Sequence, residues 1–197
     1  TTVIAEMLKA QGKRVYLGGN IGAALLPLVE QIAPDDIAVV ELSSFQLISM
    51  RRSPDVAVIT NITPNHLDMH KDMDEYVNAK KNIFLHQNAF GRTVLNRDNA
   101  LTHSFVDETR GQVLEFSRRG EVENGAWLRS DGMIMMRLNG TDTEVFPAKD
   151  IRIPGAHNVE NYMTAISAVW GRVNIEVMHE VARTFAGVEH RAEFVRE

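Results

Sequence analysis

Short runs that are apolar at every position alternate with segments of helical periodicity from residue 1 to residue 116. The runs expected to form strands are 15–17, 37–42, 56–60, 93–96 and 113–116. The segments expected to form helices are 2–11, 23–32, 43–47, 74–86 and 99–108. Fully apolar strands alternating with helices are typical of a parallel sheet that is covered on both faces. The pattern therefore predicts an α/β fold with a mostly parallel sheet and helices on both faces.

The pattern changes between residues 118 and 153. Three short runs, at 126–129, 133–137 and 143–146, are separated by Ser130-Asp131-Gly132 and by Asn139-Gly140. Turn sequences of this kind between short runs predict a β-meander. We expect residues 118–150 to form a small antiparallel appendage on the main sheet.

Two further helices are expected at 158–170 and 175–186, with Asn158 as the N-cap of the first. The segment 187–195 then alternates like the start of a strand or an interdomain linker. We therefore expect residues 1–187 to form one domain, and residues 188–197 to be a linker or the beginning of another. The first helix starts at the first residue without a capping signal, which suggests a missing upstream segment.

Composition narrows the possible functions. The chain has 197 residues, of which 44% are hydrophobic and 24% charged, as in ordinary soluble proteins. No apolar run approaches the roughly 18 residues that span a bilayer. A net charge of −5 argues against a general nucleic-acid surface. The absence of cysteine fits a reducing cytosol and excludes thiolate ligands, so a metal would need oxygen or imidazole ligands, which favours Mg²⁺ or Mn²⁺ over structural zinc.

Candidate ligands follow two of the expected strands. Glu41 ends one strand, and His66, Asp68 and His70 lie in the loop after the next. Because the carboxyl ends of parallel strands meet at one edge, these side chains could converge on one crevice. Glu41 could equally be an exposed cap, and His66 a hydrogen-bonded loop residue. As a zinc signal the His66, Asp68, His70 pattern is weak.

Two further features could take part in anion or nucleophile chemistry. Lys80 shares a helix face with Tyr76, and a desolvated lysine favours the neutral amine that can act as a nucleophile. The alternative for Lys80 is a solvated face. Gly18-Gly19-Asn20-Ile21-Gly22 follows a strand and is either an anion-binding loop or a tight turn.

Several segments together resemble the ATP-dependent Mur ligases. They are GGNIG (18–22), ELSSFQL (41–47), NITPNHLD (61–68), YVNAK (76–80), GAHN (155–158) and GVEHRAEFV (187–195). The family has an N-terminal UDP-sugar domain, a central P-loop-type ATPase domain and a C-terminal domain. The chain resembles the central domain. The family's phosphate loop and its lysine are not in the sequence, and neither Thr1 nor Thr2 is assigned its metal-binding hydroxyl.

The resemblance implies roles for particular residues. Glu41 would bind the Mg²⁺ between the β- and γ-phosphates of ATP, and His66 would bind a second Mg²⁺, with Mn²⁺ as a possible substitute. Lys80 resembles the family's carbamylated lysine, whose carbamate oxygens suit a hard cation. Asn158 would contact adenine, and Arg191 the nucleotide. The side chains of Asn20, Ser43 and Gln46 would line the path of the acceptor substrate.

The resemblance also implies a reaction and its partners. ELSSFQL beside GGNIG resembles the member that adds D-glutamate to UDP-N-acetylmuramoyl-L-alanine through an acyl phosphate, as a cytoplasmic enzyme of peptidoglycan synthesis. A monomer is expected, with neither nucleic acid nor membrane as a partner. The alternatives are a non-catalytic nucleotide-binding module, another Mur or folylpolyglutamate-type ligase, and a metal hydrolase that uses His66, Asp68 and His70.

Overall fold

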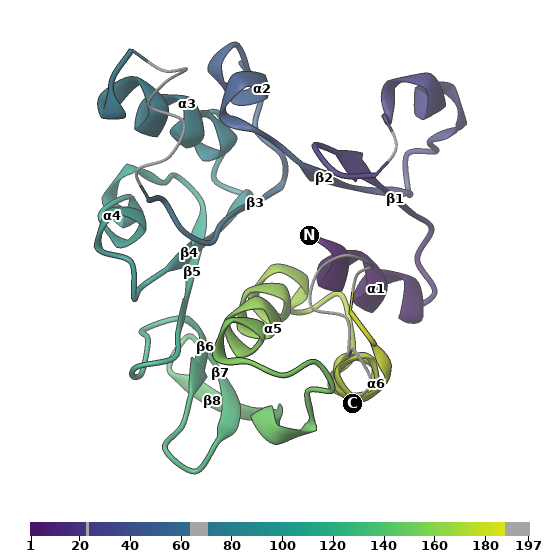
Figure 1. The fold of residues 1–197 in the computed structure, drawn as a ribbon, viewed down its shortest axis with the longest axis vertical. Helices are drawn as coiled ribbons and strands as arrows, with labels where there is room; N and C mark the ends of the chain where they lie inside the picture. The colour runs from purple at the N-terminus through teal and green to yellow at the C-terminus, as the bar shows by residue number, and fades with distance from the viewer. Residues whose placement is uncertain (23, 64–70, 188–197) are drawn as a thin grey trace, which may run out of the picture.

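The computed structural model describes residues 1–22, 24–63 and 71–187 (Figure 1). The strands are β1 (Val15–Gly19), β2 (Ile37–Glu41), β3 (Val56–Ile59), β4 (Arg92–Asn96), β5 (Gln112–Ser117), β6 (Gly125–Leu128), β7 (Met133–Leu138) and β8 (Thr141–Pro147). The α-helices are α1 (Thr2–Ala10), α2 (Ser44–Ile48), α3 (Met73–Leu85), α4 (Ala100–His103), α5 (Ala156–Val169) and α6 (Ile175–Thr184). Three 3₁₀ turns add η1 (Leu26–Gln31), η2 (Val106–Glu108) and η3 (Ala148–Asp150). No helix within the described ranges is long and apolar enough to cross a bilayer.

The larger sheet has six strands in the order β3-β4-β5-β6-β7-β8. The pairs from β3 to β6 are parallel, and the pairs from β6 to β8 are antiparallel. The predicted α/β fold and the antiparallel meander are both confirmed. The meander continues the main sheet, because β6 pairs directly with β5 in parallel. Gly125 permits this close approach, since a Cβ there would collide with the carbonyl of Glu115.

Helices cover both faces of this sheet, which is why its parallel strands are apolar at successive positions. Val94 of β4 points into a core formed with α1, α5 and α6. Its neighbour Leu95 points into the opposite core, together with Phe84 of α3 and Phe105 beside η2. Successive residues of one strand are thus buried on opposite faces, as the continuous apolar pattern predicts.

The two N-terminal strands form a separate parallel sheet, β1-β2. In the described part of the chain no strand pairs with β2 on its other side, and β3 likewise pairs only with β4. Helix α1 packs on β1 as well as on α5 and α6, so it connects the small sheet to the rest (Figure 1). The expected sheet is therefore divided in two, because sequence periodicity does not report which strands are neighbours.

Three local predictions differ from the structure. The helix expected over 99–108 is divided into α4 and η2. The helix expected over 23–32 is reduced to η1, where Pro27 lies in the first turn. Asn158 does not cap α5, since the helix already begins at Ala156 with Gly155 as its N-cap residue. Gly155 has a φ of 110°, a conformation that glycine adopts without the steric cost of a Cβ.

Candidate functional site

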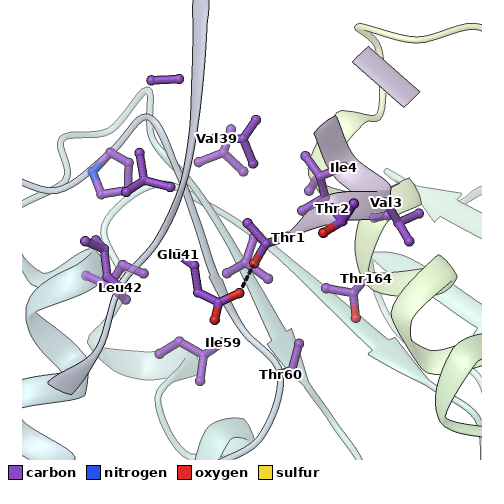
Figure 2. A pocket seen from close by; sticks show the side chains of 18 of the residues that line it. Thr1, Thr2, Val3, Ile4, Val39, Glu41, Leu42, Ile59, Thr60 and Thr164 are labelled. Atoms are coloured by element: carbon purple, nitrogen blue, oxygen red, sulfur yellow. Dashed lines mark hydrogen bonds between the residues drawn. The ribbon is translucent and has the colours of Figure 1, made fainter. Parts of the chain in front are cut away.

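A cavity of about 1990 Å³ lies between β2 and β3. Its walls come from both strands, from the start of α1, and from one face of α5. Figure 2 shows Ile59 and Thr60 on the β3 side and Thr164 of α5 across from them. The cavity reaches the carboxyl ends of β2 and β3, where open α/β sheets bind their ligands.

Glu41, the last residue of β2, lies in this cavity beside the start of α1. Thr1 is the N-cap residue of α1, and its hydroxyl donates to Glu41 Oε2 over 2.9 Å (Figure 2). No role was predicted for Thr1, because it falls in the helix after the position of the family's phosphate loop. The fold brings it to a carboxylate 40 positions away. Together the two side chains offer only oxygen atoms, the ligands that Mg²⁺ prefers.

Lys80 enters the same cavity from α3. Its ammonium lies over the Tyr76 ring at 5.6 Å from the centroid, as the shared helix face predicted. Burial lowers the pKa of Lys80, and the nearby Glu41 carboxylate partly opposes this. The direction of the shift means that desolvation outweighs the attraction, which makes the neutral amine more accessible.

Asn20 and Ser43 also line the cavity, whereas Gln46 lies outside its lining. The backbone N–H of Asn20 donates to the Glu41 carbonyl over 2.7 Å, which places the end of β1 beside the end of β2. Gly19 permits this contact, because its φ is 103° and a Cβ would meet that carbonyl.

Ser43 and Gln46 form a capping box at the start of α2. The Ser43 hydroxyl accepts from the Gln46 N–H over 3.3 Å, and Gln46 Oε1 accepts from the Ser43 N–H over 2.8 Å. Ser43 is thus the N-cap residue of α2. Their expected role toward an acceptor substrate stays a prediction.

Asn158 lines the cavity from the first turn of α5 and is only 7% exposed. Its amide nitrogen donates to the Pro154 carbonyl over 2.7 Å, and its oxygen accepts from Asn161 over 3.3 Å. Asn161 is exposed and also lines the cavity. Asn161 was not predicted as a site residue, although its spacing of three from Asn158 puts both on one helix face.

The remaining predicted site residues lie outside the described residues. They are His66, Asp68, His70 and Arg191. Within the ranges that the structure describes, no three histidine or acidic side chains gather as a metal site. The structure thus brings together Glu41, Lys80, Asn20, Ser43 and Asn158, and adds Thr1 and Asn161.

A family model described as the Mur ligase middle domain matches residues 1–169. The chain belongs to the Mur ligase family. This Mur ligase chain is 54% identical over its whole length to the UDP-N-acetylmuramoylalanine–D-glutamate ligase of Acetivibrio thermocellus. It is 51% identical to the ligase of the same name from Clostridium beijerinckii. It spans only 42% of the length of each of these relatives.

Solved Mur ligase structures share its fold. The UDP-N-acetylmuramate:L-alanyl-gamma-D-glutamyl-meso-diaminopimelate ligase from Neisseria meningitides is similar with a TM-score of 0.67 at 19% identity, over 95% of this chain and 62% of that one. MurF ligase from Thermotoga maritima, in complex with ADP, has a TM-score of 0.64 at 19% identity, over 100% of this chain and 48% of that one.

Proposed function

We propose that the protein to which this chain belongs adds D-glutamate to UDP-N-acetylmuramoyl-L-alanine at the expense of ATP. The observation that carries the proposal is the meeting of Glu41, the Thr1 hydroxyl and Lys80 in one cavity at the carboxyl ends of β2 and β3. The identity of 54% to a ligase of that name over the whole chain supports the choice of substrates.

Glu41 and Thr1 are the described residues that would hold Mg²⁺, with His66 as the expected ligand of a second ion. A bound Mg²⁺ neutralises phosphate charge and so lowers the repulsion between two anionic reactants. The donor set fits this ion, because it consists of one carboxylate and one hydroxyl. Arg191 and Asn158 keep their expected roles toward the nucleotide, and Asn161 joins Asn158 on the same wall.

Lys80 is the expected site of a carbamate. The ammonium first loses one proton, and the neutral amine then adds to the carbon of CO₂ and loses a second, so a cation becomes an anionic group with two oxygens. The burial that lowers its pKa favours the amine form that this addition requires. A mass increase matching one CO₂, mapped to Lys80 in bicarbonate-equilibrated protein, is the observation that tests this role.

The reaction has two steps. The substrate carboxylate attacks the γ-phosphorus of ATP, so an acyl phosphate forms and ADP leaves. The amine of D-glutamate then attacks the acyl carbon, the C–N bond forms, the amine loses a proton, and inorganic phosphate departs. Asn20 and Ser43, at the ends of β1 and β2, line the side from which the acceptor is expected to enter, with Gln46 beside them.

We also propose a cytoplasmic monomer, since ATP and a UDP-linked precursor are cytoplasmic metabolites.

The test is ADP release by the full-length protein carrying Glu41→Ala. We expect a loss of at least about 100-fold, because several kcal/mol of charge stabilisation disappear with the carboxylate. The matched control is Glu123→Ala, which removes an exposed carboxylate in the loop before β6 and should leave the rate unchanged. Unchanged ADP release by folded Glu41→Ala protein would remove the metal assignment.

The same assay separates the alternatives. A non-catalytic nucleotide-binding module would bind Mg²⁺–ATP without releasing ADP when D-glutamate and the UDP-linked acceptor are present. Another Mur or folylpolyglutamate-type ligase would release ADP with a different amino acid or acceptor. Either result would replace the proposed reaction.

A further inference from the structure

Asn61 follows β3, lines the cavity and is exposed to it. Its side-chain oxygen accepts a hydrogen bond of 3.0 Å from Asn96 Nδ2. Asn96 ends the neighbouring strand β4 and is only 3% exposed. A buried amide thus contacts an exposed amide at the carboxyl ends of two neighbouring strands. The direction of this bond decides which end of the Asn61 amide faces the cavity.

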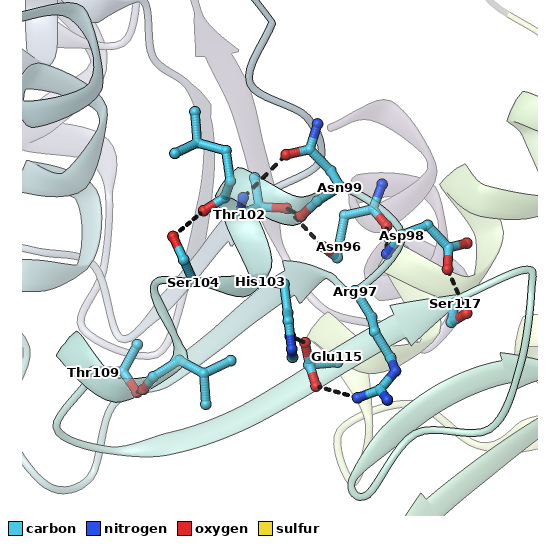
Figure 3. A network of polar contacts seen from close by, with 12 residues as sticks. Asn96, Arg97, Asp98, Asn99, Thr102, His103, Ser104, Thr109, Glu115 and Ser117 are labelled. Carbon is cyan, nitrogen blue, oxygen red and sulfur yellow. Dashed lines mark hydrogen bonds and ion pairs between the residues drawn. The ribbon is translucent and has the colours of Figure 1, made fainter. Parts of the chain in front are cut away.

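A backbone group fixes that direction. The N–H of Asp98 donates to Asn96 Oδ1 over 2.8 Å (Figure 3). A backbone N–H can only donate, so the atom of Asn96 that it contacts must be the oxygen. The other end of Asn96 is therefore the amino group, and the atom of Asn61 that it meets must be an oxygen. The Asn61 amino group is consequently the end that remains for the cavity.

Asn99 holds Ile62, the residue after Asn61, in the same way. Its Oδ1 accepts from the Thr102 N–H over 3.0 Å, so its amino group is the end that donates to the Ile62 carbonyl over 3.2 Å. Ile62 is 3% exposed and packs in the core beneath α3. Asn96, at the end of β4, thus holds the side chain of Asn61, and Asn99, at the start of α4, holds the backbone of Ile62.

We propose that Asn61 Nδ2 donates a hydrogen bond to a phosphoryl oxygen of the nucleotide, and that Asn96 is the positioning residue that aims it. Among the described residues, no protein group accepts from this amino group. It lies on the wall of the cavity that also holds Glu41 and Lys80. A preoriented neutral donor stabilises an anion without reorganising when the ligand binds. This inference rests on the proposed use of a nucleotide by this site.

The first test is Asn61→Asp in the full-length protein. The new carboxylate keeps an acceptor for Asn96, but it replaces the donor with a negatively charged oxygen. Calorimetric titration with Mg²⁺–AMP-PNP, a non-hydrolysable ATP analogue, should show an affinity at least about tenfold weaker, since a charge-assisted hydrogen bond gives way to repulsion. Asn61→Ala should weaken the affinity by a smaller factor, because it removes the donor without adding charge.

The second test separates positioning from folding. Asn96→Asp keeps the acceptor for the Asp98 N–H but offers only oxygen to Asn61, so the Asn61 amide has to flip and turn its own oxygen to the cavity. This variant should weaken AMP-PNP binding in the wild-type background and have no further effect in the Asn61→Ala background. Such complete non-additivity is not expected if Asn96 only stabilises the fold.

Asn88→Asp is the matched control, since it adds the same charge in the exposed loop before β4, where Asn88 Oδ1 accepts from the Phe90 N–H.

AMP-PNP affinity within twofold of wild type in Asn61→Asp would overturn the inference, as would additive effects of Asn96→Asp and Asn61→Ala. Weaker binding of the UDP-linked acceptor alone would assign the donor to a carboxylate and overturn the phosphoryl assignment. A wild-type protein that binds AMP-PNP but transfers no D-glutamate would remove the proposed function and leave this inference standing.

Discussion

Lys80 combines two properties that oppose each other in a folded protein. Its side chain is desolvated among Tyr76 and the cavity wall, yet an ammonium group is most stable in water. Glu41 compensates only in part, because the net shift of the Lys80 pKa is downward. The chain therefore retains a lysine at some cost in stability, as is typical of groups with a chemical role.

This cost predicts how stability depends on pH. Between the lowered folded pKa and the ordinary value near 10.4, the unfolded chain binds the Lys80 proton more readily than the folded chain does. The free energy of unfolding should therefore rise with pH through that window. We expect Lys80→Met to be more stable than wild type at neutral pH in CO₂-free buffer, with the difference shrinking as the pH approaches 10.4.

Denaturant titrations of both proteins across this range provide the measurement. Lys81→Met is the matched control, since Lys81 pairs with Glu108 at 2.6 Å and lies over the Phe105 ring. Removing that pair should lower stability by about 0.2–1 kcal/mol, opposite in sign to Lys80→Met. A Lys80→Met protein that is less stable than wild type at neutral pH would show that desolvation does not dominate at this site.

The position of a site residue was predictable wherever it follows from a place on a strand or helix. Glu41 ends an apolar strand and Lys80 shares a face with an aromatic ring, and the structure places both in one cavity. Thr1 was missed, because its partner Glu41 lies 40 positions away, and the bond between Asn61 and Asn96, 35 positions apart, was not predicted for the same reason. Contacts of that separation depend on how strands are arranged, which local sequence patterns do not encode.

Helix α5 packs against four strands of the large sheet, and its C-terminal end depends on one side chain from β4. Arg92 Nη1 donates to the carbonyls of Ser167, Ala168 and Trp170 at 3.2, 3.3 and 2.9 Å. Carbonyls at a helix end have no partner within the helix, and the partial negative charge there favours a cation. A strand residue thus ends a helix more than 70 positions later in the sequence.

We expect Arg92→Met to lower the free energy of unfolding by about 2–3 kcal/mol, because a charged donor is lost and partly buried carbonyls are left without it. For a protein of this size, that corresponds to a melting temperature lower by roughly 5–10 °C. Calorimetric melting at neutral pH gives the comparison.

Arg92→Lys is the control, since it keeps the charge but loses the fork of donors, and it should recover part of the loss. Because Arg92 Nε also donates to Gln112 Oε1 over 2.8 Å, some of the cost belongs to that bond. A melting temperature within 1 °C of wild type, as about a 0.3 kcal/mol effect would give, would contradict this account of the helix end.

Strand and helix positions were largely predictable, since they follow from the period of apolar residues. Every expected strand is present with its ends shifted by a few residues, and the meander has the expected turns. The start of α5 was not predictable, because Gly155 begins the helix with a backbone conformation that no hydrophobic pattern reports. The Asn158 amide, expected to cap the helix, instead contacts the Pro154 carbonyl.

In the described part of the chain, the parallel sheet β1-β2 and the mixed six-stranded sheet lie on either side of the cavity, which β2 and β3 line. The sequence predicted one sheet, because each strand carries the signature of burial on both faces. That signature says nothing about lateral neighbours. As a result, β2 and β3 each have one side paired and one side facing the cavity in the described chain.

This arrangement predicts an alternating pattern of amide hydrogen exchange. Residues whose N–H points to the neighbouring strand, such as Ile37, which bonds Arg14, alternate with residues whose N–H points away. We expect the amides of Val40 and Val58 to exchange at least about 100-fold faster than those of Val39 and Ala57, as an open edge has little protection. NMR-detected exchange in this 197-residue chain measures it, and equal protection on both sides would mean that the edges are covered.

The facing edges also affect how the polypeptide behaves in solution. Unpaired strand edges are adhesive, and proteins usually cover them or place charges along them. Val40 is 41% exposed beside one of these edges. Both edges line one cavity, so an extended segment that enters it meets N–H and C=O groups of β2 and β3 that have no strand partner among the described residues. We expect these open edges to promote self-association of this chain by itself that grows with concentration, and a further strand paired on them to remove that tendency and leave the monomer proposed for the full-length protein.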